Sequence, residues 1–279
     1  MIFLWLVAFV VLTALTQIGG VVLIVATLAV RLALPNVTGW RRQISVIAVF
    51  LAAYIAATTL AVPRLAAIGG RVPLPCAADS ERPLAAASPA FCLLNRNYVV
   101  ADLARLADAL SRDLDKIYPG TVTLFLDASF PFVVGFPLLP HLSHDDGRKL
   151  DLALWYRMPG GGYLPGILRS PIGYGAFEQP RPEDPQPCEP GRILTLRWDL
   201  ALLQPAFRQL ALDEDRTRAA LEWLFGEGMR FGVERVFIEP HLATRLAVKS
   251  PVLGFQGCRA ARHDDHIHVE IAGETAPSR

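Results

Sequence analysis

Two long runs without charged side chains lie near the N-terminus and constrain the chain most strongly. Residues 2–30 contain no charge, and neither do residues 44–62, which end before Pro63. About 20 apolar residues are enough to cross the hydrocarbon core of a bilayer. A cleaved signal peptide fits the first run poorly, because no basic segment precedes it, it is too long and a second run follows. We therefore predict two transmembrane helices, at about 2–30 and 44–62.

The charges that flank these runs predict their orientation. Three arginines lie between the runs (Arg31, Arg41 and Arg42), and two follow the second run (Arg64 and Arg71). By the positive-inside rule, the connection between the runs is cytoplasmic. We therefore expect the N-terminus and everything after residue 62 to lie outside the membrane.

Four cysteines support an extracytoplasmic location, since all of them follow the second run and none forms a CxxC pair. They are Cys76, Cys92, Cys188 and Cys258. Such spacing is typical of two disulfides in an oxidising compartment, with four buried free thiols as the alternative. Three pairings are open, and we favour Cys76–Cys92 with Cys188–Cys258.

The charge balance excludes one class of function. The 279 residues carry a net charge of +1 and contain no basic tract, so we expect no nucleic-acid partner. The length allows one good-sized domain or two small ones.

Helical and extended patterns interleave irregularly after the second run. Residues 63–95 have the composition of a juxtamembrane linker, and residues 96–279 form the predicted folded domain. Predicted helices cover 97–117, 200–210, 214–225 and 240–248, and predicted strands cover 121–126, 151–156, 192–198, 233–238 and the tail at 263–271. Residues 158–191 are rich in Gly and Pro, and they either line a substrate cleft or form a tolerated insertion. This order favours an α+β fold with a central, mainly antiparallel sheet.

Five of the six histidines fall into two short motifs. The tail contains His263, His266 and His268, and its alternation places His266, His268 and Glu270 on one face of a strand. The other motif begins with His141 and continues through residue 151. A chain this apolar has little reason to gather imidazoles twice unless they share a role, so we predict one joint site.

Three residues of these motifs form the candidate metal site. His144 and Asp151 lie seven positions apart with Gly147 between them, and His268 completes the set. Two imidazoles, a carboxylate and an open fourth position are typical of catalytic zinc, whereas structural zinc favours cysteine. His266 lies about 7 Å from His268 along the strand, which suits a general base for the activated water.

The two motifs resemble those of zinc peptidases that group lysostaphin-type enzymes, D-Ala-D-Ala metallopeptidases and penicillin-insensitive murein endopeptidases. The pattern His-x6-Asp followed by His-x-His is shared by the group, and the murein endopeptidases are the most similar. The resemblance spans about residues 121–271. It implies zinc ligands His144, Asp151 and His268, with His266 as catalytic base and His141 and His263 near the zinc. Asp145 and Lys149 depart from the pattern.

The resemblance implies a bacterial inner-membrane enzyme whose zinc peptidase domain faces the periplasm and cuts peptide cross-links of peptidoglycan. Arg148 or Arg262 could then hold a substrate carboxylate. A D-Ala-D-Ala carboxypeptidase is an alternative enzyme. A wall-binding or regulatory module that keeps zinc without turnover is an alternative of another class.

Overall fold

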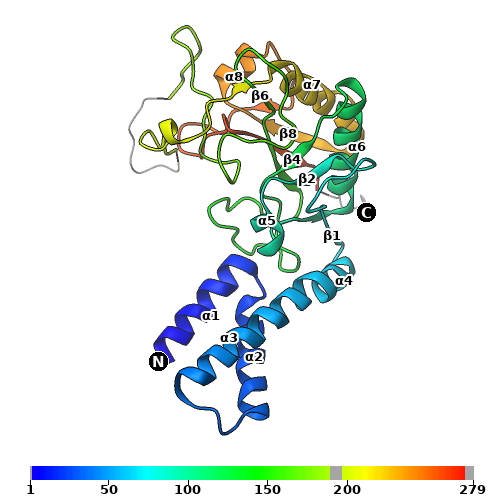
Figure 1. The fold of residues 1–279 in the computed structure, drawn as a ribbon. Coiled ribbons are helices and arrows are strands. Elements are labelled where there is room, and N and C mark those ends of the chain that lie inside the picture. Colours follow the sequence, from blue (N-terminus) through cyan, green and yellow to red (C-terminus); the bar gives the residue numbers. More distant parts are fainter. Residues whose placement is uncertain (1, 189–196, 274–279) are drawn as a thin grey trace.

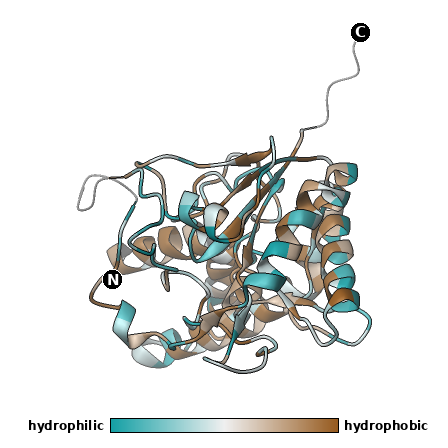
Figure 2. Cartoon of the chain, turned by 90° about the horizontal axis from the view of Figure 1, so that it is seen from above, coloured by the Kyte–Doolittle hydropathy of each residue, from teal (hydrophilic) through white to brown (hydrophobic). Residues whose placement is uncertain are grey.

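Apolar helices form the N-terminal part of the structure, which is a computed structural model that describes residues 2–188 and 197–273 (Figure 1). They are α1 (Ile2–Thr16), α2 (Gly19–Ala33), α3 (Gly39–Ala56), a π-helical turn (Ala57–Ala61) and α4 (Val62–Ile68). Hydropathy colouring shows these helices mostly brown, whereas helices beside the sheet also carry hydrophilic faces (Figure 2).

The first apolar run is two helices, so the expectation of one membrane span over 2–30 is wrong. The chain reverses at Gln17, whose φ is 67°. Gly20 packs so closely on α1 that a Cβ there would lie 2.1 Å from Oγ1 of Thr13. Each helix has 15 residues and is therefore about 22 Å long, shorter than the roughly 30 Å bilayer core.

Among the described residues, one helix is long and apolar enough to cross a membrane, and it runs over Gly39–Ile68. It contains the whole second apolar run. The start of α1 points away from the folded domain, toward the side of residues 34–38 (Figure 1). The prediction placed the N-terminus and the folded domain on the same side, whereas the additional reversal at Gln17 turns the start of α1 away from that domain.

A six-stranded mixed sheet lies at the centre of the folded domain, in the order β2-β4-β5-β10-β8-β9. The strands are β2 (Leu84–Ala86), β4 (Thr123–Phe125), β5 (Lys149–Ala153), β8 (Val233–Phe237), β9 (Leu253–Gly254) and β10 (His266–Ile271). The inner pairs are antiparallel, as expected. The outer pairs, β2 with β4 and β8 with β9, are parallel, so the fold is mixed α/β.

Two long helices, α6 (Ala101–Ile117) and α7 (Glu214–Phe225), lie side by side against the sheet (Figure 1). The predicted three-to-four-residue spacing buries Leu103, Leu106, Leu110 and Leu114 completely in the main core. Burying each leucine contributes on the order of 1.5–3 kcal/mol, which is enough to hold the helix against the strands.

The expected linker contributes strands to the folded domain. β1 (Arg71–Pro73) pairs with β3 (Tyr98–Val100), while β2 joins the central sheet and α5 (Pro89–Leu93) follows it. Arg71 is buried, and its guanidinium donates to Oγ of Ser129 at 2.7 Å. Composition alone did not reveal this part of the domain, because its strands are only three residues long.

Several other predicted elements are confirmed and others need correction. The helix at 214–225 and the strand at 233–238 are present, and α8 (Pro240–Arg245) is shorter than expected.

The helix expected at 200–210 is wrong, since only the 3-10 turn Gln204–Ala206 forms before β7 (Ala211–Leu212). The strand expected at 151–156 is divided between β5 and β6 (Tyr156–Arg157), and a 3-10 helix covers Glu227–Phe231. Most of the strand expected at 192–198 lies outside the described residues.

The two disulfides have the favoured pairing. Cys76 is bonded to Cys92, and Cys188 is bonded to Cys258. The second bridge joins the Gly/Pro-rich segment to the loop before β10. It therefore links this segment to the loop that leads into the strand with His266 and His268.

Candidate metal centre

The centre of the sheet places two of the three predicted ligands opposite each other. Asp151 on β5 is the direct partner of His268 on β10 in an antiparallel pair. Facing side chains in such a pair have Cβ atoms about 4.5–5.5 Å apart. His144 lies before β5, and Gly147, with a φ of 78°, allows the chain to turn from it into the strand.

Three electron-pair donors converge there. Nδ1 of His268 lies 2.7 Å from Oδ1 of Asp151, and Nε2 of His144 lies 3.1 Å from the same Nδ1. Nε2 of His144 lies 3.3 Å from Oδ1 of Asp151. All three side chains are buried, and the group could hold a metal ion.

Outer hydrogen bonds orient both imidazoles and set the tautomer of His144. Nδ1 of His144 lies 2.8 Å from the carbonyl oxygen of Ala128, which can only accept, so this nitrogen carries the proton. Nε2 of His268 lies 3.1 Å from a carboxylate oxygen of Glu270. The lone pair of Nε2 of His144 therefore faces the carboxylate of Asp151, and a metal ion at Nδ1 of His268 would leave the proton of that ring on Nε2, toward Glu270. Metal-bound histidines are oriented by such partners.

The donor set fits a tetrahedral ion. Nitrogen and oxygen ligands about 2.0–2.1 Å from zinc stand roughly 3.3 Å from one another. The distances of 2.7–3.3 Å between the three donor atoms are close to this separation. Three protein donors leave a fourth position free, as catalytic sites do.

The protonation states of His144 and Asp151 suit a cation. Burial opposes a charge on His268, but its hydrogen bonds to Asp151 and Glu270 outweigh burial and raise its pKa. Burial lowers the pKa of His144 and outweighs the opposing effect of Asp151, so this imidazole is neutral. Burial by itself would raise the pKa of Asp151, but His144 and His266 reverse this and hold it well below its usual range. A neutral imidazole and an ionised carboxylate are the forms in which these side chains bind metals.

His266 lies beside the three donors. Its Nδ1 is 2.5 Å from Oδ1 of Asp265, and its Nε2 is 3.7 Å from Oδ1 of Asp151. Burial opposes a charge on His266, but Asp151 and Asp265 outweigh it and raise its pKa to about 9. The bond to Asp265 leaves Nε2 as the nitrogen free to exchange a proton.

His141 occupies the other flank of Asp151. Its Nδ1 lies 2.9 Å from Oδ2 of Asp127 and 3.4 Å from Oδ2 of Asp151. Asp127 in turn accepts two hydrogen bonds from the guanidinium of Arg96, at 2.6 and 2.8 Å. The hydrogen bonds from Arg96 to Asp127, and between Asp127 and His141, fix the position of His141 at the rim of the site.

A pocket of about 190 Å³ opens beside His266. His141, His266 and Asp265 line its polar part, and its apolar part comes from Ile172, Tyr174, Phe177, Trp198 and Leu200. Most of the apolar residues belong to the Gly/Pro-rich segment and the region after it. Of the two roles left open for residues 158–191, the structure thus gives part of the segment the position of a pocket wall.

The remaining predicted residues have distinct positions. The ring of His263 lies 4.8 Å from that of His266 and 5.6 Å from that of His268, centre to centre. Arg262 lines the pocket, yet its guanidinium is bound by Asp264 and Asp199 and stacks over Phe177.

Arg148 lies three residues before Asp151, and its side chain donates to the carbonyl oxygen of Ala272. It is therefore at the end of β5 away from the pocket.

Tyr174 was not predicted and has a central position. Its hydroxyl donates to Oδ2 of Asp151 at 2.6 Å and accepts from the backbone N–H of Asp127 at 3.1 Å. The flanking Gly173 and Gly175 have φ of 87° and 83°. A Cβ at Gly173 would also lie 2.2 Å from Leu126. The Gly-Tyr-Gly pattern was the available signal, since it marks a backbone that approaches the sheet closely.

The position of Asp265 differs from the one that strand alternation predicts. The predicted strand covered 263–271 and placed Asp265 on the face away from the histidines. β10 begins at His266, so the residues before it do not follow the two-residue period. Asp265 can therefore bond to the ring of His266.

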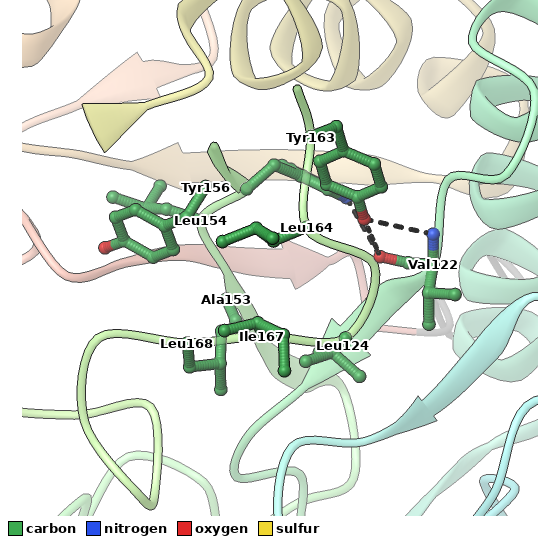
Figure 3. Close-up of a pocket in the computed structure, with 11 residues that line it drawn as sticks. Val122, Leu124, Ala153, Leu154, Tyr156, Tyr163, Leu164, Ile167 and Leu168 are labelled. Carbon is green, nitrogen blue, oxygen red and sulfur yellow. Dashed lines mark hydrogen bonds between the residues drawn. The ribbon is translucent and has the colours of Figure 1, made fainter. Parts of the chain in front are cut away.

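A second, much smaller pocket of about 10 Å³ lies away from the histidines (Figure 3). Leucine side chains and the rings of Tyr156 and Tyr163 surround it. The hydroxyl of Tyr163 accepts from the N–H of Val122 and donates to its carbonyl oxygen. No ionised or metal-binding side chain lines this pocket. The contacts around it, including the two hydrogen bonds of Tyr163, hold the Gly/Pro-rich segment against the sheet.

No protein-family model matches the chain, and no curated protein matches it. The likeness to zinc peptidases therefore rests on the two histidine motifs.

Proposed function

We propose that this protein is a membrane-anchored zinc peptidase that hydrolyses peptide cross-links of peptidoglycan outside the bacterial inner membrane. The observation that carries the proposal is the meeting of His144, Asp151 and His268 at 2.7–3.3 Å, next to the free Nε2 of His266. Nitrogen and oxygen donors, with sulfur absent, favour a catalytic zinc over a structural one. Both disulfides and the apolar helix Gly39–Ile68 support an anchored domain in an oxidising compartment.

Zinc held by the three donors would polarise the scissile carbonyl and make water a stronger acid and nucleophile. Nε2 of His266 then accepts the proton of the attacking water, while Asp265 holds Nδ1 and stabilises the charged ring. Tyr174 occupies Oδ2 of Asp151 and so leaves Oδ1 for the metal.

A cation beside Asp151 offsets the carboxylate that raises the pKa of His266. Metal binding therefore moves this pKa down from about 9, toward the neutral range in which a general base works best.

The choice of peptidoglycan rests on the motif resemblance together with the proposed anchoring. The pocket beside His266 offers an apolar wall and a polar floor, which suits a short peptide stem better than a folded protein. Arg262 is already bound by Asp264 and Asp199, so we assign it the support of the pocket wall rather than capture of a substrate carboxylate.

Digestion of purified muropeptides by the full chain in detergent tests the proposal, with mass spectrometry as the readout. We expect cross-linked dimers to be split, and a chelator to stop the reaction until zinc is restored. Loss of only the terminal D-Ala would instead identify a carboxypeptidase. Tight muropeptide binding without any cleavage would identify a wall-binding module.

A further inference from the structure

The loop before the first histidine motif exposes an unusual number of apolar side chains. Residues 130–143 contain no Asp, Glu, Lys or Arg. Five large apolar side chains on this loop are exposed, namely Phe132, Val133, Val134, Leu139 and Leu142, and the exposed fraction reaches 69% at Val134. An exposed contiguous apolar patch marks a contact surface.

The loop is firmly built, so these side chains are held outward. Phe130 and Leu138 are buried, and the ring of Phe136 packs edge-on against Phe130 at 5.4 Å between centroids. Gly135 turns the chain with a φ of 80°, and its N–H donates to the carbonyl oxygen of Asp145. Some apolar side chains of the loop, such as Phe130 and Leu138, therefore hold it in place from inside the domain, while the five exposed ones point outward.

The apolar helices lie directly beside this loop. The backbone N–H of Phe132 donates to Oε1 of Gln17 at 2.8 Å, and Gln17 is the reversal between α1 and α2. Asn95 on the same side of the domain donates to the carbonyl oxygen of Thr16 at 3.3 Å. Figure 1 shows the green loop between the sheet and the domain-facing end of α1.

The surface of α1 is apolar as well. Its outward side chains include Leu6 and Val10, which are exposed although they are large and apolar. A helix that is apolar on all sides matches lipid tails rather than water. Because the loop is bonded to the end of this helix, the medium that surrounds α1 also reaches the loop.

We propose that residues 131–142 are seated in the interface of the bilayer that holds the N-terminal helices, with the five apolar side chains inserted among the lipids. This inference rests on the membrane anchoring in the proposed function. Apolar side chains at a bilayer surface bind in proportion to their buried area. His141 and His144 end the same loop, so the metal centre is held beside the membrane surface.

Lipid quenching of a fluorophore tests this placement in the full chain. Since all four native cysteines are in disulfides, a single added cysteine can be labelled without reductant. The variants are Val134→Cys on the loop, Leu6→Cys on α1 and Ile117→Cys, which is 56% exposed at the C-terminal end of α6. Each is reconstituted into phosphatidylcholine and phosphatidylglycerol vesicles with or without brominated acyl chains.

We expect brominated lipid to quench the label at Val134 and at Leu6 several-fold more than the label at Ile117. Quenching at Leu6 with none at Val134 would overturn the seating of the loop and leave the anchoring intact. No quenching at Leu6 would overturn the anchoring itself. If the whole loop is seated in the bilayer, brominated lipid should quench a second label, at Leu139→Cys, as strongly as the label at Val134.

Discussion

His268 and Asp151 face each other on adjacent antiparallel strands, with Nδ1 of the imidazole 2.7 Å from Oδ1 of the carboxylate. This pairing anchors the candidate metal centre to the two middle strands of the sheet, where the backbone is least free to move. Of the three donor residues, only His144 lies on a loop. A rigid platform with one loop-borne ligand is suited to precise metal geometry.

Removal of the loop-borne ligand should abolish metal binding. In His144→Ala the remaining donors are His268 and Asp151, and two protein ligands are too few for a stable tetrahedral site. We expect wild-type protein to hold about one zinc per chain by elemental analysis and the variant to hold almost none. His241→Gln is the matched control, because His241 binds the carbonyl oxygen of Glu178 outside the site. Full zinc in His144→Ala would refute this ligand assignment.

Replacement of His266 should separate metal binding from turnover. His266→Gln keeps a polar side chain beside Asp265 but cannot take up a proton at Nε2. We expect zinc content to stay at the wild-type level and hydrolysis to fall by roughly 10²–10⁴-fold, the usual contribution of a general base. Muropeptide cleavage and elemental analysis on the same preparation measure both. A variant with normal activity would exclude the base role.

The hydroxyl of Tyr174 should tune the metal site without forming part of it. Tyr174→Phe keeps the ring, which lies 4.6 Å from His141 and 5.1 Å from His266 between centroids. It removes the hydrogen bond to Oδ2 of Asp151. Loss of such an outer partner costs about 10–100-fold in metal affinity. Competition with a chromogenic chelator measures this loss, and unchanged affinity would show that Oδ2 needs no partner.

The Asp127 carboxylate should make the fold sensitive to acid. Burial by itself would raise the pKa of Asp127, but His141 and Arg96 outweigh it and hold the pKa below its usual value. Stability from this group is therefore present above about pH 4, the value for an unfolded aspartate, and is lost as the pH falls through the native pKa.

Asp127→Asn tests this acid sensitivity because it removes the titrating group. The difference in unfolding free energy between pH 7 and pH 3 should be smaller in the variant than in the wild type. Chemical denaturation at both pH values, with chelator present, gives this difference. An equal difference in both proteins would contradict the assignment.

Short-range sequence patterns were enough to predict the local chemistry of the site. The spacing of His144 and Asp151, and the alternation of His266 and His268, follow from short-range geometry in a turn and a strand. The same is true of the leucine spacing in α6 and of the cysteines, which all lie after the apolar runs. These features depend on neighbours within a few residues, and so their physical cause is already present in the chain.

The contacts between distant parts of the chain could not be predicted in the same way, because they depend on tertiary packing. Tyr174 reaches Asp151 because Gly173 and Gly175 bring a loop against the sheet. This loop has no hydrophobic periodicity from which its contact with the sheet could be predicted. The reversal at Gln17 has the same character, since it depends on the close packing of Gly20 against α1. The short strands β1 and β2 form because their partners, β3 and β4, come from later segments of the chain. Packing between segments remote in sequence supplies these contacts, and local propensity does not encode it.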